Sequence, residues 1–333
     1  MTVIYHDGQA NPDHLNGKQV AIIGYGALGR PVALNLRDSG INVLVGARGE
    51  QTREAALADG LQVLTMAEAV QQSDILILLL PDEVMPTFYL EQISPHLRRG
   101  HVLLFGSAYP VTFRFIEPPP FVDVGLIAPR ILGMAVREQY EMGEGFQSFV
   151  AVAQDASGQA WETVLAVASG MGALRGGAVE VSFEQEAELD LFVHQAIMPA
   201  LHHLLTTAAD VLIARGYPPE AAFTELYLST ELSHYFQQAA QRGLLNTLAL
   251  TPLTNQYGTV SRMSRFDELK LERVMETALK DIHSGDFARE WAKESSGGYR
   301  RLKNYLKTQE KLDLWELEQQ TLEMLGRHPE AIE

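Results

Sequence analysis

The 333-residue sequence predicts an α/β protein, with a doubly wound sheet of Rossmann type in its N-terminal part and an all-helical C-terminal part. Three observations predict this architecture. The stretch from Val20 to Gly29 is an apolar run followed at once by the pattern G-x-G-x-x-G. Apolar runs then alternate with segments of helical spacing, which indicates a parallel sheet. From residue 182 onward the apolar residues keep helical spacing, without strand-like alternation.

The glycine pattern predicts a dinucleotide-binding turn. Gly24 permits the tight turn, Gly26 lets the backbone approach a pyrophosphate, and Gly29 lets the following helix pack closely on the strand. The free N–H groups at the start of that helix would hold the phosphates. A helix over residues 30–39 and a second apolar run over 41–45 complete a βαβ unit, the context that distinguishes this motif from a chance pattern. The predicted cofactor-binding residues here are Gly24, Tyr25, Gly26, Ala27, Leu28 and Gly29.

The other strands and helices of the N-terminal part follow in order. Apolar runs predict strands over residues 19–24, 41–46, 62–64, 75–80, 101–105 and 123–127. Helices are predicted over residues 30–39, 51–60, 66–72 and 84–93. Residues 75–80 are all apolar, which is typical of a strand buried on both faces of a parallel sheet. Ligands of such sheets bind at the carboxyl ends of the strands, here residues 24–29, 46–53, 81–83, 106–108 and 128–130.

The C-terminal part is predicted to be helical throughout. Apolar residues recur at helical spacing over residues 183–215, 219–242 and 266–284. A charged helical segment over 302–325 is expected at the periphery. We expect the domain boundary near residues 176–182, which gives a nucleotide-binding domain over 1–181 and a helical dimerisation and substrate domain over 182–333.

Composition excludes several classes of partner and site. With 26 basic and 42 acidic residues the net charge is −16, which argues against a nucleic-acid or anionic-membrane partner. The chain has no cysteine, which excludes disulfides, thiolate metal sites and a cysteine nucleophile. No signal peptide opens the chain and no apolar run approaches 18 residues. We therefore expect a cytoplasmic protein with a small-molecule substrate, no nucleic acid and no membrane.

The loop after the second strand bears on the choice of cofactor. An NAD site usually carries an acidic residue at the end of this strand, whereas here Arg48 follows it. Arg48, Thr52 and Arg53 could hold a 2′-phosphate, which favours NADP(H). Glu50 in the same loop favours NAD(H), and a solvated loop without ligand contacts is the simplest alternative.

Several motifs, in order along nearly the whole chain, resemble those of the ketol-acid reductoisomerase family. They are Gly24-Tyr25-Gly26 with residues 33–40, Leu79-Leu80-Pro81-Asp82-Glu83, Ile127-Ala128-Pro129, residues 154–158, residues 188–192, Gln256-Tyr257-Gly258 and residues 285–291. The resemblance implies a Rossmann domain, a helical domain that is knotted in this family, and a homodimer in which the helical domains interlock. It also implies the family's usual NADP preference, and it adds Leu80, Pro81 and Asp82 to the cofactor-binding residues.

The resemblance also shows where this chain departs from the family at the metal site. The family holds two Mg²⁺ ions with an aspartate and a glutamate one turn apart, which fall on Asp190 and His194. A second pair of glutamates, from the neighbouring subunit, falls on Tyr227 and Glu231. Two hard cations need several carboxylates, and imidazole suits transition metals better than Mg²⁺. We therefore expect at most one divalent metal, held by Asp190, His194 and Glu231, with Glu186 nearby; a metal-free site is the favoured alternative.

Three further departures fall near the expected substrate. The family's histidine after the fifth strand falls on Ser107, its lysine after Ala-Pro on Arg130, and a substrate-binding serine on Pro252. Arg130 could clamp a substrate carboxylate or form a structural ion pair. Ser107 could donate one hydrogen bond, although a hydroxyl without an adjacent base is not an activated nucleophile.

These departures predict an NAD(P)H-dependent oxidoreductase of this family that acts on a small carbonyl or imine carboxylate without the Mg²⁺-dependent isomerisation. His194 or Tyr227 is the predicted proton donor, and a surface ion pair with Asp190 is the simplest alternative for His194. Two other functions stay open. One is a true ketol-acid reductoisomerase with a divergent site, and the other is a non-catalytic nucleotide-binding protein.

Overall fold

The structure is a computed structural model that describes residues 2–327 of the chain. Contacts divide the chain into two compact units, Met1–Asp190 and Leu191–Glu333, and each is described by itself. This division falls inside helix α9 (Phe183–Phe192). The first turns of α9 belong to the N-terminal unit because Phe183 and Ala187 are buried in its core.

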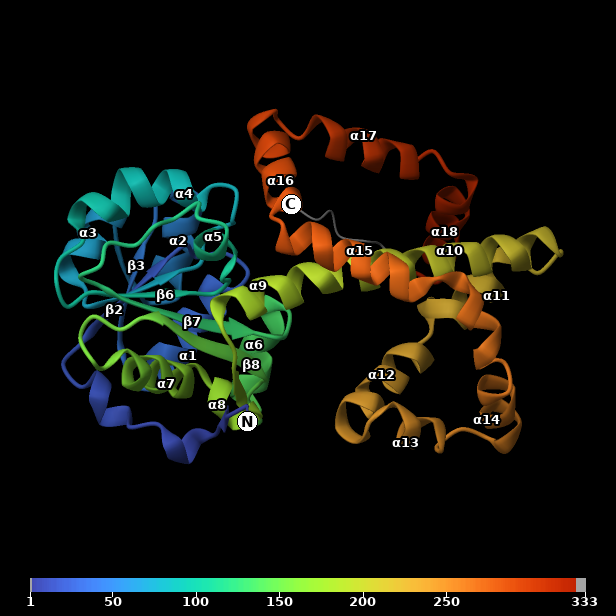
Figure 1. The fold of residues 1–333 in the computed structure, drawn as a ribbon, viewed down its shortest axis with the longest axis horizontal. Helices are drawn as coiled ribbons and strands as arrows, with labels where there is room; N and C mark the ends of the chain where they lie inside the picture. The colour runs from blue at the N-terminus through green and yellow to red at the C-terminus, as the bar shows by residue number, and fades with distance from the viewer. Residues whose placement is uncertain (1, 328–333) are drawn as a thin grey trace. The chain divides into compact units, whose positions relative to one another are not determined.

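A nine-stranded sheet forms the centre of the N-terminal unit (Figure 1), in the order β1-β9-β8-β7-β6-β5-β2-β3-β4. The six predicted strands are present as β2 (Gln19–Ile23), β3 (Asn42–Gly46), β4 (Gln62–Leu64), β5 (Ile75–Leu78), β6 (Val102–Phe105) and β7 (Asp123–Pro129). These six strands pair in parallel, with β2 between β3 and β5. The predicted doubly wound sheet is therefore confirmed.

Three strands extend the sheet beyond the prediction and make it mixed. They are β8 (Ser148–Gln154), β9 (Ala178–Glu180) and β1 (Ile4–Tyr5). β8 runs antiparallel to β7, β9 runs parallel to β8, and β1 closes the edge antiparallel to β9. β1 and β9 have only two and three residues, which is too short for a period-two pattern to be recognised in the sequence.

Helices cover both faces of this sheet (Figure 1). Along β2, Val20 and Ile22 lie in one apolar cluster, while Ala21 and Ile23 lie in a second cluster on the other face. This explains the uninterrupted apolar runs, because a strand covered on both faces has no polar side. The helices are α1 (Gly29–Asp38), α2 (Glu50–Ala58), α3 (Met66–Gln72), α4 (Met85–Phe88), α5 (Tyr109–Thr112), α6 (Gly133–Glu141), α7 (Ala160–Met171) and α8 (Ala173–Gly176).

The second unit is helical throughout its described part, as the sequence predicts. The predicted helix over 219–242 is interrupted at Ser229 and Thr230, and the one over 302–325 is two helices. The α-helices are α10 (Met198–Ala214), α11 (Pro219–Phe223), α12 (Glu231–Arg242), α13 (Leu244–Leu248), α14 (Leu253–Val260), α15 (Leu271–His283), α16 (Asp286–Ser296), α17 (Arg300–Gln309) and α18 (Asp313–Met324).

One helical stretch of the described chain, Phe183–Ala214, is long and apolar enough to cross a membrane by length and composition. Its 32 residues have a mean hydropathy of 1.4 over the most apolar window, and 11% of that window is buried. Polar residues interrupt this stretch, so it contains no continuous apolar run of membrane-spanning length. A single such helix is weak evidence for a membrane span, and its first turns pack into the sheet core through Phe183 and Ala187.

Candidate functional site

The glycine-rich turn joins β2 to α1 in the geometry that a pyrophosphate-binding turn requires. Gly24 has a φ of +102°, and a Cβ atom there would lie 2.6 Å from the Leu79 carbonyl oxygen. A Cβ atom on Gly29 would lie 1.9 Å from the Gly24 carbonyl oxygen, so the helix packs against the turn. Gly26 has no atom within 4 Å of its Cβ position. The turn is therefore closed toward the protein and open where phosphates would approach.

A cavity of about 670 Å³ lies above this turn, at the carboxyl ends of β2, β3, β5 and β6. This volume is in the range of small-molecule sites. Ten of the twelve predicted cofactor residues line the cavity; Gly29 and Arg53 do not. Met66, Met85 and Phe88 also line it and were not predicted, because their apolar side chains resemble ordinary core residues. The lining is residues 24–28, 46–49, 52, 66, 78–82, 85, 88, 106 and 107.

Arg48 stands at the β3 end of this cavity. Its Cζ atom lies 5.2 Å from the centre of the Phe88 ring, so a cation–π contact orients the guanidinium. Glu50, the residue that favoured NAD(H), is the first residue of α2. A carboxylate in the first helical turn is stabilised by the helix dipole. Glu50 therefore has a structural explanation that requires no ribose contact.

Tyr25 is nearly buried beside the turn and takes part in a polar triad that the sequence did not reveal. Its phenol donates to Asp59 Oδ2 at 2.7 Å, and Arg30 donates to both oxygens of Asp59 at 2.7 and 2.9 Å. Burial raises the pKa of Tyr25, and its contact with Asp59 adds to the effect. The triad therefore connects the glycine-rich turn, through Tyr25, and α1, through Arg30, to Asp59 at the end of α2.

Arg130, which follows β7, is held between two carboxylates of α9. Its Nη2 donates to Glu186 Oε1 at 2.9 Å and its Nη1 to Asp190 Oδ1 at 3.1 Å. The guanidinium also lies 5.0 Å from the centre of the Phe149 ring. Both terminal nitrogens of Arg130 are thus engaged by carboxylates of the chain itself.

These ion pairs of Arg130 with Glu186 and Asp190 form the Arg130 bridge. Glu186 is its buried end, with 1% of its area exposed. Its second oxygen accepts from the Ala108 backbone N–H at 2.8 Å. Burial raises the pKa of Glu186, although Ala108 and Arg130 act in the opposite direction. The adjacent Ser107 lines the cavity, and its Oγ accepts from the Tyr109 N–H at 3.3 Å. The bridge therefore connects the end of β6 with the end of β7.

Asp82 follows β5 and lines the same cavity. Burial raises the pKa of this carboxyl to about 7, and the negative charges of Glu83, Glu186 and Asp190 contribute. Asp82 was predicted only as a cofactor contact; the sequence did not indicate that carboxylates of α9 face it.

The remaining predicted residues belong to the second unit. His194 is exposed, in the π-helical segment Val193–Ile197, and Glu231 is exposed at the start of α12. The Tyr227 phenol donates to Glu318 of α18 in a very short hydrogen bond. Burial raises the pKa of Tyr227, and its contact with Glu318 adds to the effect. Among the residues that the structure describes, no group of three or more His, Asp or Glu side chains is placed to hold a metal ion.

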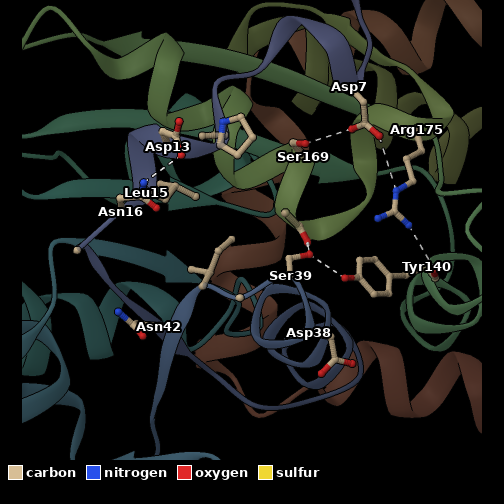
Figure 2. A pocket seen from close by; sticks show the side chains of 16 residues that line it. Asp7, Asp13, Leu15, Asn16, Asp38, Ser39, Asn42, Tyr140, Ser169 and Arg175 are labelled. Carbon is tan, nitrogen blue, oxygen red and sulfur yellow. Dashed lines mark hydrogen bonds and ion pairs between the residues drawn. The ribbon is translucent and has the colours of Figure 1, made fainter.

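A second cavity, of about 580 Å³, lies near the amino end of β3 (Figure 2). Ser169 donates to Asp7 at 3.1 Å, Arg175 lies 3.7 Å from Asp7, and Ser39 is hydrogen-bonded to Tyr140 at 2.7 Å. Figure 2 shows these side chains directed at one another across the cavity. Because their polar groups are paired and ligands of such sheets bind at the carboxyl ends, the first cavity is the better candidate for a ligand site.

Comparisons with known proteins agree with the two-part organisation. A family model described as the NADPH-binding domain of acetohydroxy acid isomeroreductase matches residues 14–177. The model of the ketol-acid reductoisomerase C-terminal domain matches residues 183–326.

Individual relatives match most of the chain. A ketol-acid reductoisomerase (NADP(+)) from Pyrobaculum calidifontis is 40% identical over 92% of this chain and 93% of its own length. A putative ketol-acid reductoisomerase 3 from Saccharolobus solfataricus is 39% identical over 87% of this chain and 88% of its own. The solved structure of an NADH-preferring ketol-acid reductoisomerase from an uncultured archean superposes with a TM-score of 0.90 and 32% identity. That match covers 98% of this chain and 100% of the other.

Proposed function

The chain belongs to the ketol-acid reductoisomerase family, and from this premise we propose that it is an NADPH-dependent reductase without the family's isomerisation step. Its substrate in this proposal is a small carbonyl or imine compound that bears a carboxylate. Membership of the family makes the chain an NAD(P)-dependent oxidoreductase. The loss of Mg²⁺-dependent isomerisation and the roles of individual residues go beyond family membership and are our proposal.

The observation that carries this proposal is the Arg130 bridge to Glu186 and Asp190. In the family, as the resemblance implies, the position of Asp190 holds Mg²⁺. Here a guanidinium, which keeps its charge at any physiological pH, already takes one oxygen of that carboxylate. Arg130 would compete with a first dication for that oxygen, and a second dication would lack ligands because His194 and Tyr227 replace glutamates. The residues present therefore do not fit a pair of magnesium ions.

In this reading the chain's residues orient a carbonyl beside the cofactor, which supplies hydride. Arg130 supplies a fixed positive charge at the end of β7. The Ser107 Oγ accepts from the Tyr109 N–H, so its hydroxyl hydrogen is available for a hydrogen bond to the substrate. Within the second unit, His194 is exposed and stays a candidate proton donor, whereas Tyr227 is a weaker candidate because its phenol already donates to Glu318.

Turnover of two substrates in the presence and absence of Mg²⁺ tests this proposal. Acetolactate must be isomerised before it can be reduced, whereas hydroxypyruvate is already a 3-hydroxy-2-oxo acid. We expect NADPH oxidation with hydroxypyruvate in EDTA and none with acetolactate at any Mg²⁺ concentration. Binding of NADPH with no turnover of any carbonyl or imine would indicate a non-catalytic nucleotide-binding protein.

A complete ketol-acid reductoisomerase is the second candidate, favoured by 40% identity with a curated enzyme over 92% of this chain. It predicts Mg²⁺-dependent consumption of acetolactate with stoichiometric oxidation of NADPH. That result would reject our reading of Arg130 and would mean that metal ligands are supplied by other side chains.

We propose that NADP(H) is the preferred cofactor and that Arg48 selects it. Replacing Arg48 by methionine should weaken NADPH binding about 10- to 100-fold, because a charge-assisted hydrogen bond to the 2′-phosphate contributes about 1.5–3 kcal/mol. NADH binding should change little. Fluorescence titration of both cofactors measures the effect, with Arg53→Met as the matched control because Arg53 does not line the cavity. Equal losses for NADPH and NADH would contradict the role of Arg48.

We also propose a homodimer formed through the helical unit. Its helices α13 and α14 expose large apolar side chains, including Leu245 with 78% and Leu253 with 81% of their area accessible. Contiguous exposed apolar surface usually marks an interaction site. Light scattering of the purified protein measures the mass in solution; a monomer would contradict this proposal.

A further inference from the structure

We propose that the Asp82 carboxyl is the acid that protonates the substrate oxygen as hydride arrives at the carbonyl carbon. This inference rests on the proposed reductase function and assigns its proton to a residue of the N-terminal unit. Neither His194 nor Tyr227, the donors expected from the sequence, is required for it.

The position of Asp82 in the cavity supports this role. In the strand order β6-β5-β2-β3, the phosphate-binding turn after β2 lies at the centre. Arg48 follows β3 on one side, where it would take the adenosine half of the cofactor. The part of the cavity over the ends of β5 and β6 would then be left for the nicotinamide half. Asp82 follows β5 and Ser107 follows β6, and both line the cavity there.

No other acid among the described lining residues is placed to donate. The ionisable side chains of this lining are Tyr25, Arg48 and Asp82. The Tyr25 phenol already donates its hydrogen bond to Asp59 and its pKa is raised, and an arginine does not release its proton in proteins. Ser107 and Arg130 occupy the positions of the family's histidine and lysine, and neither is a usable acid at neutral pH. Asp82 is the carboxyl that remains.

The groups around Asp82 favour its protonated form. Glu83 is its neighbour in the same loop, and Glu186 and Asp190 face it from α9. Burial raises the pKa of the Tyr109 phenol of α5, and the charge of the nearby Asp82 adds to the effect. Arg130 offsets part of the charge on Glu186 and Asp190. With a pKa raised to about 7, Asp82 can still carry its proton near neutral pH, whereas an ordinary aspartate would have lost it.

The step balances without a further reactant. Bound NADPH would supply a hydride, whose electron pair would form the new C–H bond, and it would leave as NADP⁺. The π electron pair of the carbonyl moves to oxygen and takes the proton from the Asp82 carboxyl. Asp82 is left as a carboxylate and regains a proton from water before the next turnover.

Steady-state kinetics with NADPH and hydroxypyruvate across pH 5–9 test the assignment. For the wild type we expect kcat/KM to be highest at low pH and to fall above about pH 7, because the acid must be protonated. Asp82→Asn should lower kcat/KM about 100-fold or more and remove this limb, with NADPH affinity unchanged in a fluorescence titration. Glu91→Gln, an exposed carboxylate on the following helical segment, is the matched control and should behave as wild type. Glu83→Gln should move the limb to lower pH without lowering its plateau.

A second measurement does not depend on turnover. The pKa of Asp82 is higher in the folded chain than the usual 3.9 of an unfolded one, so folded wild type loses stability as pH rises from about 4 to about 7. Asp82→Asn should lack this loss, and its urea midpoint should exceed that of wild type increasingly toward pH 8.

The possible outcomes separate the two proposals. A wild type that reduces no carbonyl contradicts the proposed function, and the proton assignment with it. A wild type that turns over while Asp82→Asn keeps its rate and pH profile contradicts the role of Asp82 alone. A urea midpoint difference that does not change with pH would also overturn it, because Asp82 would then have an ordinary pKa.

Discussion

Replacing Gly29 by alanine is expected to abolish NADPH binding at millimolar concentration and to lower the free energy of unfolding by about 3 kcal/mol. The added Cβ would lie 1.9 Å from the Gly24 carbonyl oxygen, which is far inside van der Waals contact with a backbone atom. Helix α1 must then move away from β2, and the N–H groups at its start move with it. Fluorescence titration with NADPH and urea denaturation measure the two effects.

Gly26→Ala is the matched control for the effect of Gly29→Ala on the free energy of unfolding. No atom lies within 4 Å of the Cβ position of Gly26, so the substitution should leave the free energy of unfolding nearly unchanged. NADPH affinity should still fall, because the methyl group occupies the open side that the pyrophosphate approaches. If Gly29→Ala binds NADPH as tightly as wild type, the turn is not the phosphate site.

Replacing Arg130 by methionine is expected to lower the free energy of unfolding by about 3–5 kcal/mol at pH 8. The reason is that Glu186, with 1% of its area exposed, would keep a buried charge with only the Ala108 N–H as a donor. The pKa of Glu186 is already raised by burial and would rise further. The loss of stability relative to wild type should therefore be small near pH 4. It should grow as the pH rises above the usual glutamate pKa of about 4.3.

The double variant Arg130→Met with Glu186→Gln isolates the cause of this loss. Glutamine has the same shape and no charge, so most of the stability should return at pH 8. Urea denaturation at pH 4 and pH 8 compares the two variants with wild type. A loss of equal size at both pH values would show that Arg130 stabilises the unit through packing on Phe149 rather than through the carboxylates.

The parallel core of the sheet was predictable because its strands are buried on both faces. Strand β5 is apolar at every position since both of its faces are covered, and such a run has few alternative explanations. The turn from Gly24 to Gly29 was equally clear, because its three glycines stand at fixed spacing and two of them, Gly24 and Gly29, leave no room for a Cβ atom. The antiparallel extension by β8, β9 and β1 was missed, since two of these strands are too short to carry a period.

The partners of polar side chains were much harder to predict. The bond from Tyr25 to Asp59 and the bridge from Arg130 to Glu186 join residues that are 34 and 56 positions apart. Nothing in the local pattern distinguishes Asp59 or Glu186 from other acidic residues on helices. The raised pKa of Asp82 depends on carboxylates from another helix, so only the folded arrangement could reveal it.

The pairing of β1 with β9 sets the order in which the N-terminal unit can be completed. Ile4 pairs with Val179, so strand β1 cannot find its partner until residue 179 has been synthesised. During translation the parallel strands can assemble while β1 stays unpaired and β9 does not yet exist. Contacts between residues so distant in sequence form slowly, and an unpaired strand edge invites association with other chains. The N-terminus therefore closes the sheet last, and an N-terminal fusion or tag should affect the yield of folded protein more than the stability of the finished molecule.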